Sequence, residues 1–150
     1  MPRSPPARLW ESRWSRRRSC SARPGPHRSI MAGLNCGTPS LLAWPTLRAG
    51  LTGSLVIDDA LAETAMVLLA EDGVAAGETG AAAAAALLAL ADEPEVRGRL
   101  GLDHESRVVL LCTEGATDPD GYQRVVGRAP DEVDAAAFSA AARRRGRRTG

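Results

Sequence analysis

The stretch RVVLLCT, at residues 107–113, decides the fold class of this 150-residue chain. It is short and rich in β-branched and aliphatic residues. Its apolar residues are consecutive, so both faces of the strand would be apolar. A strand with one face in water alternates apolar and polar residues, so a strand that is apolar on both faces is covered on both. The stretch therefore predicts a central strand of a parallel sheet with helices on both faces, which is an α/β fold.

The residues after this strand form the first candidate site. In open α/β sheets, ligands bind beyond the carboxyl ends of the strands, where this chain reads TEGATD at residues 113–118. Thr113 is the best single candidate, although a threonine that only ends a strand fits the same pattern. Glu114, Asp118 and Asp120 could together bind a cation, but a solvated loop is the favoured interpretation.

Signals for helices flank the strand. Thr38 followed by Pro39 predicts the start of a helix that ends at Gly50 and that Pro45 should kink or split. Asp58 is the predicted N-cap of a helix that ends at Gly73. The other predicted elements are a short strand at residues 55–57 and helices over residues 81–91, 94–101 and 130–145.

Charge divides the chain into three parts, although the formal net charge is only +1. Residues 1–28 contain eight Arg, one acid and no apolar periodicity, which predicts a disordered segment. Residues 29–127 contain five Arg and fourteen acids and are the predicted folded part, while residues 128–150 predict a helical Ala- and Arg-rich tail. A mis-set start or a shifted reading frame would explain the abrupt change in composition. A targeting segment is disfavoured, because residues 1–28 lack an apolar helix face.

All 19 basic residues are arginine, so the chain contains no lysine. This excludes a Schiff-base lysine, a lysine general base and a lysine-containing phosphate loop. The near-neutral net charge produces no long-range field that would attract nucleic acid or an anionic membrane. The two Arg-rich ends leave association with nucleic acid as a weaker alternative.

The sequence predicts a cytoplasmic protein without a membrane segment or a metal site. The longest apolar run, residues 81–91, is about half of the roughly 20 residues that a membrane-spanning helix needs. No apolar stretch follows the basic N-terminus, as a secretory signal requires. Cys20, Cys36 and Cys112 are odd in number and lack the spacing of a disulfide framework or a zinc site.

Three motifs occur in order: PGPHRSIMAGLNCGTP at residues 24–39, AGETGAA at residues 76–82 and CTEGATDP at residues 112–119. Together they resemble the C-terminal third of the diaminopropionate ammonia-lyase family, over about residues 24–127. That family belongs to the pyridoxal-phosphate enzymes that include threonine and serine dehydratases and the tryptophan synthase β chain. The resemblance implies an incomplete C-terminal piece of that α/β fold, helix-rich and with a few parallel strands.

The resemblance also implies a reaction, the pyridoxal-phosphate-dependent α,β-elimination of 2,3-diaminopropionate to pyruvate and ammonia. The cofactor is the electron sink, and the protein holds its ring, phosphate and pyridine nitrogen. Thr113 matches the Ser, Thr or Cys that hydrogen-bonds the pyridine nitrogen. Glu78 matches a carboxylate that binds a metal or braces its turn, and bracing is the favoured role. Gly33, with Met31 and Ala32, would lie near the ring face, although simple packing is favoured.

Two parts of the family's site are missing from this sequence. These are the lysine that forms the Schiff base and the glycine-rich phosphate loop, both upstream of the matched region in the family. We therefore predict a truncated lyase-like protein with an incomplete core, no catalytic residue of its own and no activity alone; the family's substrate is a small amino acid. The alternatives are a non-catalytic module that docks onto a separate N-terminal fragment or forms a homodimer, and an Arg-rich protein associated with nucleic acid.

Overall fold

The computed structural model describes residues 8–11, 25, 26 and 28–135 of the chain. Most of the predicted disordered segment and the end of the predicted last helix lie outside these residues. No helix in the described part is long and apolar enough to cross a membrane. In chain order the elements are β1 (Arg8–Glu11), the 3-10 helix η2 (Ala32–Leu34), α1 (Trp44–Gly50), β2 (Gly53–Val56), α2 (Asp59–Glu71), α3 (Ala82–Ala91), α4 (Pro94–Leu100) and α5 (Pro119–Val126).

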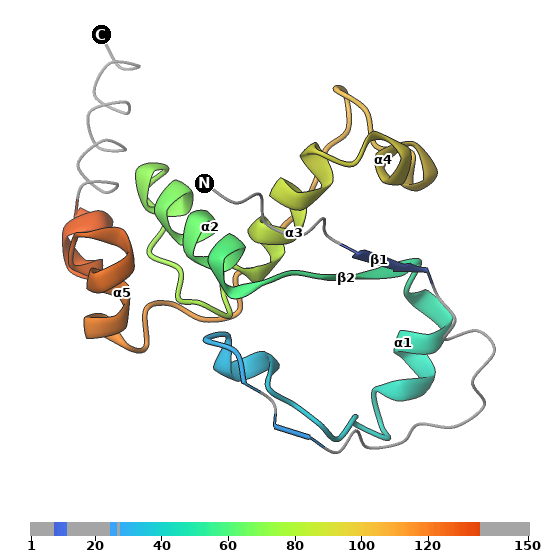
Figure 1. Ribbon diagram of the computed structural model, residues 1–150, viewed down its shortest axis with the longest axis horizontal. Coiled ribbons are helices and arrows are strands. Elements are labelled where there is room, and N and C mark those ends of the chain that lie inside the picture. The colour runs from blue at the N-terminus through green and yellow to red at the C-terminus, as the bar shows by residue number, and fades with distance from the viewer. Residues whose placement is uncertain (1–7, 12–24, 27, 136–150) are drawn as a thin grey trace, which may run out of the picture.

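Helix α2 packs against α3 and α5 (Figure 1), and these helices hold the buried core together with residues 130–135; we call this region the helix core. Met66, Tyr122 and Val133 are its largest fully buried side chains. Val133 lies in a further helical stretch at residues 130–135, which is the described part of the predicted last helix. Small side chains allow helices to approach closely. Most of the other buried side chains are small: Ala62, Ala65, Ala70, Ala76, Ala81, Ala85 and Ala89.

The ends of α2 and α4 agree with the predicted capping residues and terminal glycines. Asp58 caps α2, because its carboxylate accepts the N–H of Leu61 at 2.8 Å. Gly73, just beyond the end of α2, has a φ of 81°, a left-handed conformation that glycine adopts readily. Gly101 ends α4 in the same way, with a φ of 68°.

The predicted helix from Thr38 is wrong in its start. Helix α1 begins at Trp44, and Pro45 lies in its first turn rather than in its middle. Proline has a fixed φ and no N–H, so it suits the first turn of a helix, where that N–H would have no partner within the helix. Pro45 therefore begins the helix that it was expected to kink.

The two named strands pair with each other. β1 and β2 are antiparallel, with Arg8 opposite Val56 and Glu11 opposite Gly53. β2 confirms a short strand here, although it spans residues 53–56 and not the predicted 55–57. β1 was not predicted, and it lies in the segment that was expected to be disordered. The sequence predicted parallel strands, whereas this pairing is antiparallel. Figure 1 shows this sheet and α1 set apart from the helix core.

The central strand predicted at residues 107–113 does not form within the described part of the chain. We call residues 107–113 the docking stretch. They have no ladder partner there, and the nearest pairing is an isolated antiparallel bridge between Ala76 and Gly115. A strand exists only through hydrogen bonds to a neighbouring strand. The prediction of a strand at these residues is therefore wrong for the described chain, because no described segment pairs with them.

Candidate functional site

The first motif lies against α2 and reaches the turn of the second motif, residues 77–80, which we call the glycine turn. The carboxylate of Asp59 accepts the hydroxyl of Ser29 at 2.6 Å and the N–H of Ile30 at 3.3 Å. The N–H of Gly33 donates to Thr79 Oγ1 at 3.0 Å. A Cβ on Gly33 would lie 2.9 Å from Thr79 Cγ2, so a larger residue here would force the Thr79 side chain or the first motif to shift.

The glycine turn also packs on the third motif. A Cβ on Gly80 would overlap the carbonyl oxygen of Glu114 and lie 3.0 Å from Cys112 Sγ. A Cβ on Gly77 would overlap the carbonyl oxygen of Gly115. Because the atoms in the way are backbone atoms, a side chain at either glycine would push the third motif away. The three motifs that carry the family resemblance therefore meet at this turn.

Thr113 lies on the third motif, beside the residues that contact the glycine turn. The adjacent Cys112 thiol donates to the carbonyl oxygen of Glu114 at 3.3 Å, which shapes the chain around Thr113. Thr113 itself is exposed, and its hydroxyl makes no hydrogen bond to the residues that the structure describes. The hydroxyl is therefore free to donate to a ligand.

Glu78 is half-buried and faces the start of α5. Its Oε1 lies 3.3 Å from the position that a Cβ on Gly121 would occupy. It also lines a groove of about 630 Å³, together with Glu63 of α2 and Arg124 of α5. No hydrogen bond joins Glu78 to the described residues, so the predicted bracing role is not visible as a polar contact and stays a prediction.

Met31 is buried, whereas the neighbouring Ala32 and Gly33 are exposed. The burial of Met31 agrees with the favoured interpretation, in which this residue packs within the protein. The role of Gly33 near a cofactor ring stays a prediction, and its contact with Thr79 gives it a structural role as well.

No group of three His, Cys, Asp or Glu residues in the described ranges is arranged to hold a metal ion. Asp118, one of the acids considered for a cation site, instead caps α5 by accepting the N–H of Gly121 at 3.0 Å.

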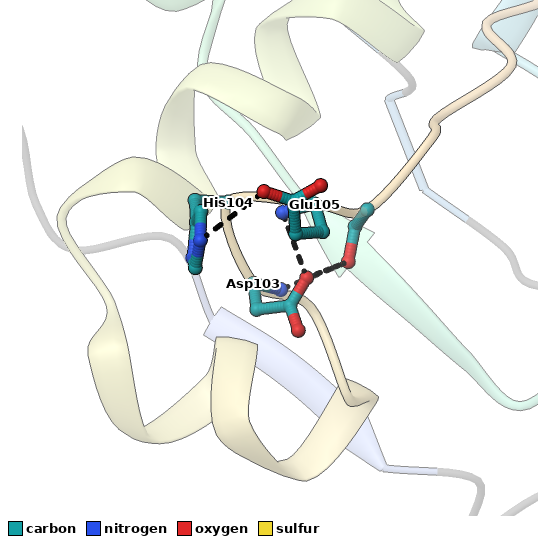
Figure 2. A network of polar contacts seen from close by, with 4 residues as sticks. Asp103, His104 and Glu105 are labelled. Carbon is teal, nitrogen blue, oxygen red and sulfur yellow. Dashed lines mark hydrogen bonds and ion pairs between the residues drawn. The ribbon is translucent and has the colours of Figure 1, made fainter.

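A polar turn precedes the docking stretch (Figure 2). The carboxylate of Asp103 accepts the N–H of Glu105 at 3.0 Å and the hydroxyl of Ser106 at 2.9 Å. His104 Nε2 lies 3.3 Å from Glu105 Oε1, and both side chains are exposed. These contacts fix the local backbone, and their arrangement does not indicate a catalytic or binding site.

Helix α5 and its buried tyrosine were missed by the sequence reasoning. Tyr122 is fully buried, and its hydroxyl has no hydrogen-bond partner within the described residues. Burial raises the pKa of Tyr122; Arg128 lowers it and Asp134 raises it further. The Asp118-Pro119 pair and Gly127 were the available signals, because Asp caps a helix, Pro begins one and Gly ends one.

Comparison with known proteins defines the class. The sequence profile of the family "Pyridoxal-phosphate dependent enzyme" matches residues 11–114, and the chain belongs to that family. Within it, the chain is 35% identical over 107 residues to the diaminopropionate ammonia-lyase of Salmonella typhimurium, covering 65% of this chain and 26% of that enzyme. It is 33% identical over 106 residues to that of Escherichia coli K12, covering 65% of this chain and 27% of that enzyme.

A solved structure shows the same fold. The crystal structure of the Escherichia coli diaminopropionate ammonia-lyase, in complex with an aminoacrylate-PLP azomethine reaction intermediate, matches with a TM-score of 0.61 and 32% identity. The match covers 65% of this chain and 28% of that one. The predicted family and fold class are therefore confirmed, with helices dominating and few strands. The chain spans about a quarter of the length of the curated relatives it matches.

Proposed function

We propose that this chain forms the pyridine-nitrogen side of the cofactor site of a pyridoxal-phosphate-dependent lyase acting on 2,3-diaminopropionate. The observation that carries the proposal is the meeting of the three motifs at the glycine turn, where Gly33 donates to Thr79 and where backbone atoms leave Gly77 and Gly80 no room for a side chain. These contacts hold Cys112 and Glu114, the neighbours of Thr113, and so position the exposed Thr113 beside the turn. The name of these relatives, diaminopropionate ammonia-lyase, indicates the reaction.

The residues present fit one part of the cofactor and not another. Thr113 has an unengaged hydroxyl, which suits a hydrogen bond to an uncharged ring nitrogen. When bound, pyridoxal phosphate draws electrons away from the substrate's Cα. The Thr113 hydroxyl would hold that nitrogen through a hydrogen bond without transferring a proton to it. No side-chain amine exists anywhere in the sequence to hold the cofactor's carbonyl carbon.

We infer that the chain as given is inactive alone and that a lysine-bearing polypeptide region completes the site. The chain covers only about a quarter of its relatives, which supports this division. We also propose that it acts in the cytoplasm, because its cysteines lack the spacing of a disulfide framework.

The first test mixes the purified chain with pyridoxal phosphate after its N-terminal amine has been blocked. We expect no visible absorbance band that survives dialysis, because no other amine can bind the aldehyde. A stable band, or pyruvate released from diaminopropionate by the chain alone at an enzyme-like rate, would contradict the proposal.

The second test measures the chain together with the part of the Escherichia coli enzyme that it does not match. We expect pyruvate release, and a roughly ten-fold lower kcat for Thr113→Val, which corresponds to the loss of one hydrogen bond. Thr113→Ser keeps the hydroxyl and should keep the rate. Thr117→Val is the matched control, since Thr117 is an exposed threonine four residues away. Equal rates for Thr113→Val and Thr117→Val would remove Thr113 from the site.

A further inference from the structure

The docking stretch shows a pattern of exposure with a period of two. Val109 and Leu111 are 86% and 75% exposed, whereas Val108 and Leu110 are 45% and 39% exposed. Alternation of this kind is expected of extended chain, because successive side chains point to opposite sides. One face of the stretch therefore lies toward the rest of the chain, and the other is uncovered.

Both ends of the docking stretch are held in place. The hydrogen bonds of Asp103 to Glu105 and Ser106 fix the turn before it. At its other end, Cys112 and the two residues that follow the stretch, Glu114 and Gly115, pack on the glycine turn. The backbone between these anchors has no strand partner among the described residues. An extended, anchored and unpaired apolar segment is a template for the addition of another strand.

The chemistry of the site indicates what the added strand belongs to. Thr113 ends the docking stretch, so a polypeptide that pairs with the stretch lies beside the proposed ring-nitrogen contact. The family profile covers residues 11–114 and therefore includes the whole stretch. About 72% of the solved Escherichia coli enzyme lies outside the match, although the matched part adopts the same fold. A second copy of this chain would bring no lysine.

We propose that residues 107–113 are the docking strand for the lysine-bearing polypeptide region, which adds a parallel strand beside them and covers Val109 and Leu111 with apolar side chains. The parallel direction follows from the apolar character of both faces. The identity of the partner rests on the function proposed above. The docking itself depends only on the backbone and the exposed face.

The experiment co-expresses the full 150-residue chain with the Escherichia coli enzyme from which the matched stretch has been removed. The partner's Schiff-base lysine is replaced by alanine in a parallel arm. We expect the two polypeptides to copurify in both arms, with amide hydrogen exchange slowed across residues 107–113. Pyruvate release is expected only with the lysine present.

The decisive variant is Val109→Pro, which removes one backbone N–H from the middle of the docking strand. Association should weaken at least about ten-fold, or about 1.4 kcal/mol. Val109→Thr is the matched control, because it keeps the N–H, the β-branch and the β-propensity. Since Val109 is exposed, both variants should retain the circular dichroism of the unmodified chain.

Four outcomes would overturn the docking proposal: no copurification, unchanged association for Val109→Pro, protection confined to other residues, or equal protection of the chain alone through self-association. Copurification with protection of residues 107–113 but without pyruvate would support docking and count against the proposed lyase function. The two proposals can therefore fail separately.

Discussion

The helix core and the docking stretch are both apolar, yet one is closed and the other is open. Ala65, Ala85 and Met66 are fully buried, while Val109 and Leu111 are mostly exposed. Amphipathic helices can bury their apolar faces against each other within one short chain. A strand that is apolar on both faces needs neighbouring strands and two covering layers. The contrast teaches that the two regions differ in the number of partners they require.

The largest expected effect tests whether the helix core is closed as described. Tyr122→Ala removes a fully buried ring and should lower the free energy of unfolding by about 3–5 kcal/mol. Tyr122→Phe is the matched variant; because the hydroxyl has no partner in the described part, its removal should cost little or stabilise. Urea unfolding followed by circular dichroism measures both. If the two substitutions cost the same, the hydroxyl has a partner and the ring does not fill the core.

The next effect tests the join between the two regions. Gly80→Ala would place a Cβ against the carbonyl oxygen of Glu114, so the third motif must shift away from the glycine turn. We expect a loss of about 1–3 kcal/mol of stability. Gly98→Ala is the control, since Gly98 lies within α4 with nothing near its Cβ position. It should gain about 0.5–1 kcal/mol from helix propensity. A neutral Gly80→Ala would separate the docking stretch from the core.

A smaller effect tests the start of α2. Asp58→Ala removes the carboxylate that accepts the N–H of Leu61 and should cost about 1 kcal/mol. Asp58→Asn retains an acceptor oxygen at the cap and should cost much less. Thermal unfolding of the two variants gives the comparison. An equal loss in both would show that the carboxylate's charge, rather than its hydrogen bond, stabilises the helix start.

The sequence predicted the helix core better than the docking stretch. α2, α3 and α4 lie close to their predicted ranges, because caps, apolar spacing and terminal glycines are local signals. The contact of Gly33 with Thr79 joins residues 46 positions apart and has no local signal. The docking stretch was expected to pair with neighbouring strands, and it does not. Its apolar pattern indicates that it needs such neighbours, but the pattern cannot show whether the chain supplies them. Family resemblance placed Thr113, Glu78 and Gly33 on the three motifs, while α5 was missed because its capping signals were read as a loop.

Alkaline pH gives a further test of the core. Burial raises the pKa of Tyr122 above its usual value of 10.0, so the folded chain favours the neutral phenol. The associated stability is fully present below pH 10 and is lost as the pH rises through the folded-state pKa. Tyr122→Phe should lack this part of the pH dependence. Tyrosinate absorbance reports the titration without interference, since Tyr122 is the only tyrosine. An ordinary titration midpoint in the folded chain would contradict the burial of the hydroxyl.

The smallest expected effect bears most directly on the comparison. Val109→Asp introduces a charge into the docking stretch, but Val109 is 86% exposed, so the free energy of unfolding should change by no more than about 0.5 kcal/mol. Met66→Asp places the same charge at a fully buried position and should prevent folding, because an unpaired buried charge is costly. Circular dichroism and urea unfolding separate the two. A loss of several kcal/mol for Val109→Asp would show that the stretch is already packed within this chain. A near-zero change would mean that the exposed Val109 contributes nothing to the fold of the chain itself, so its apolar character requires a partner to explain it.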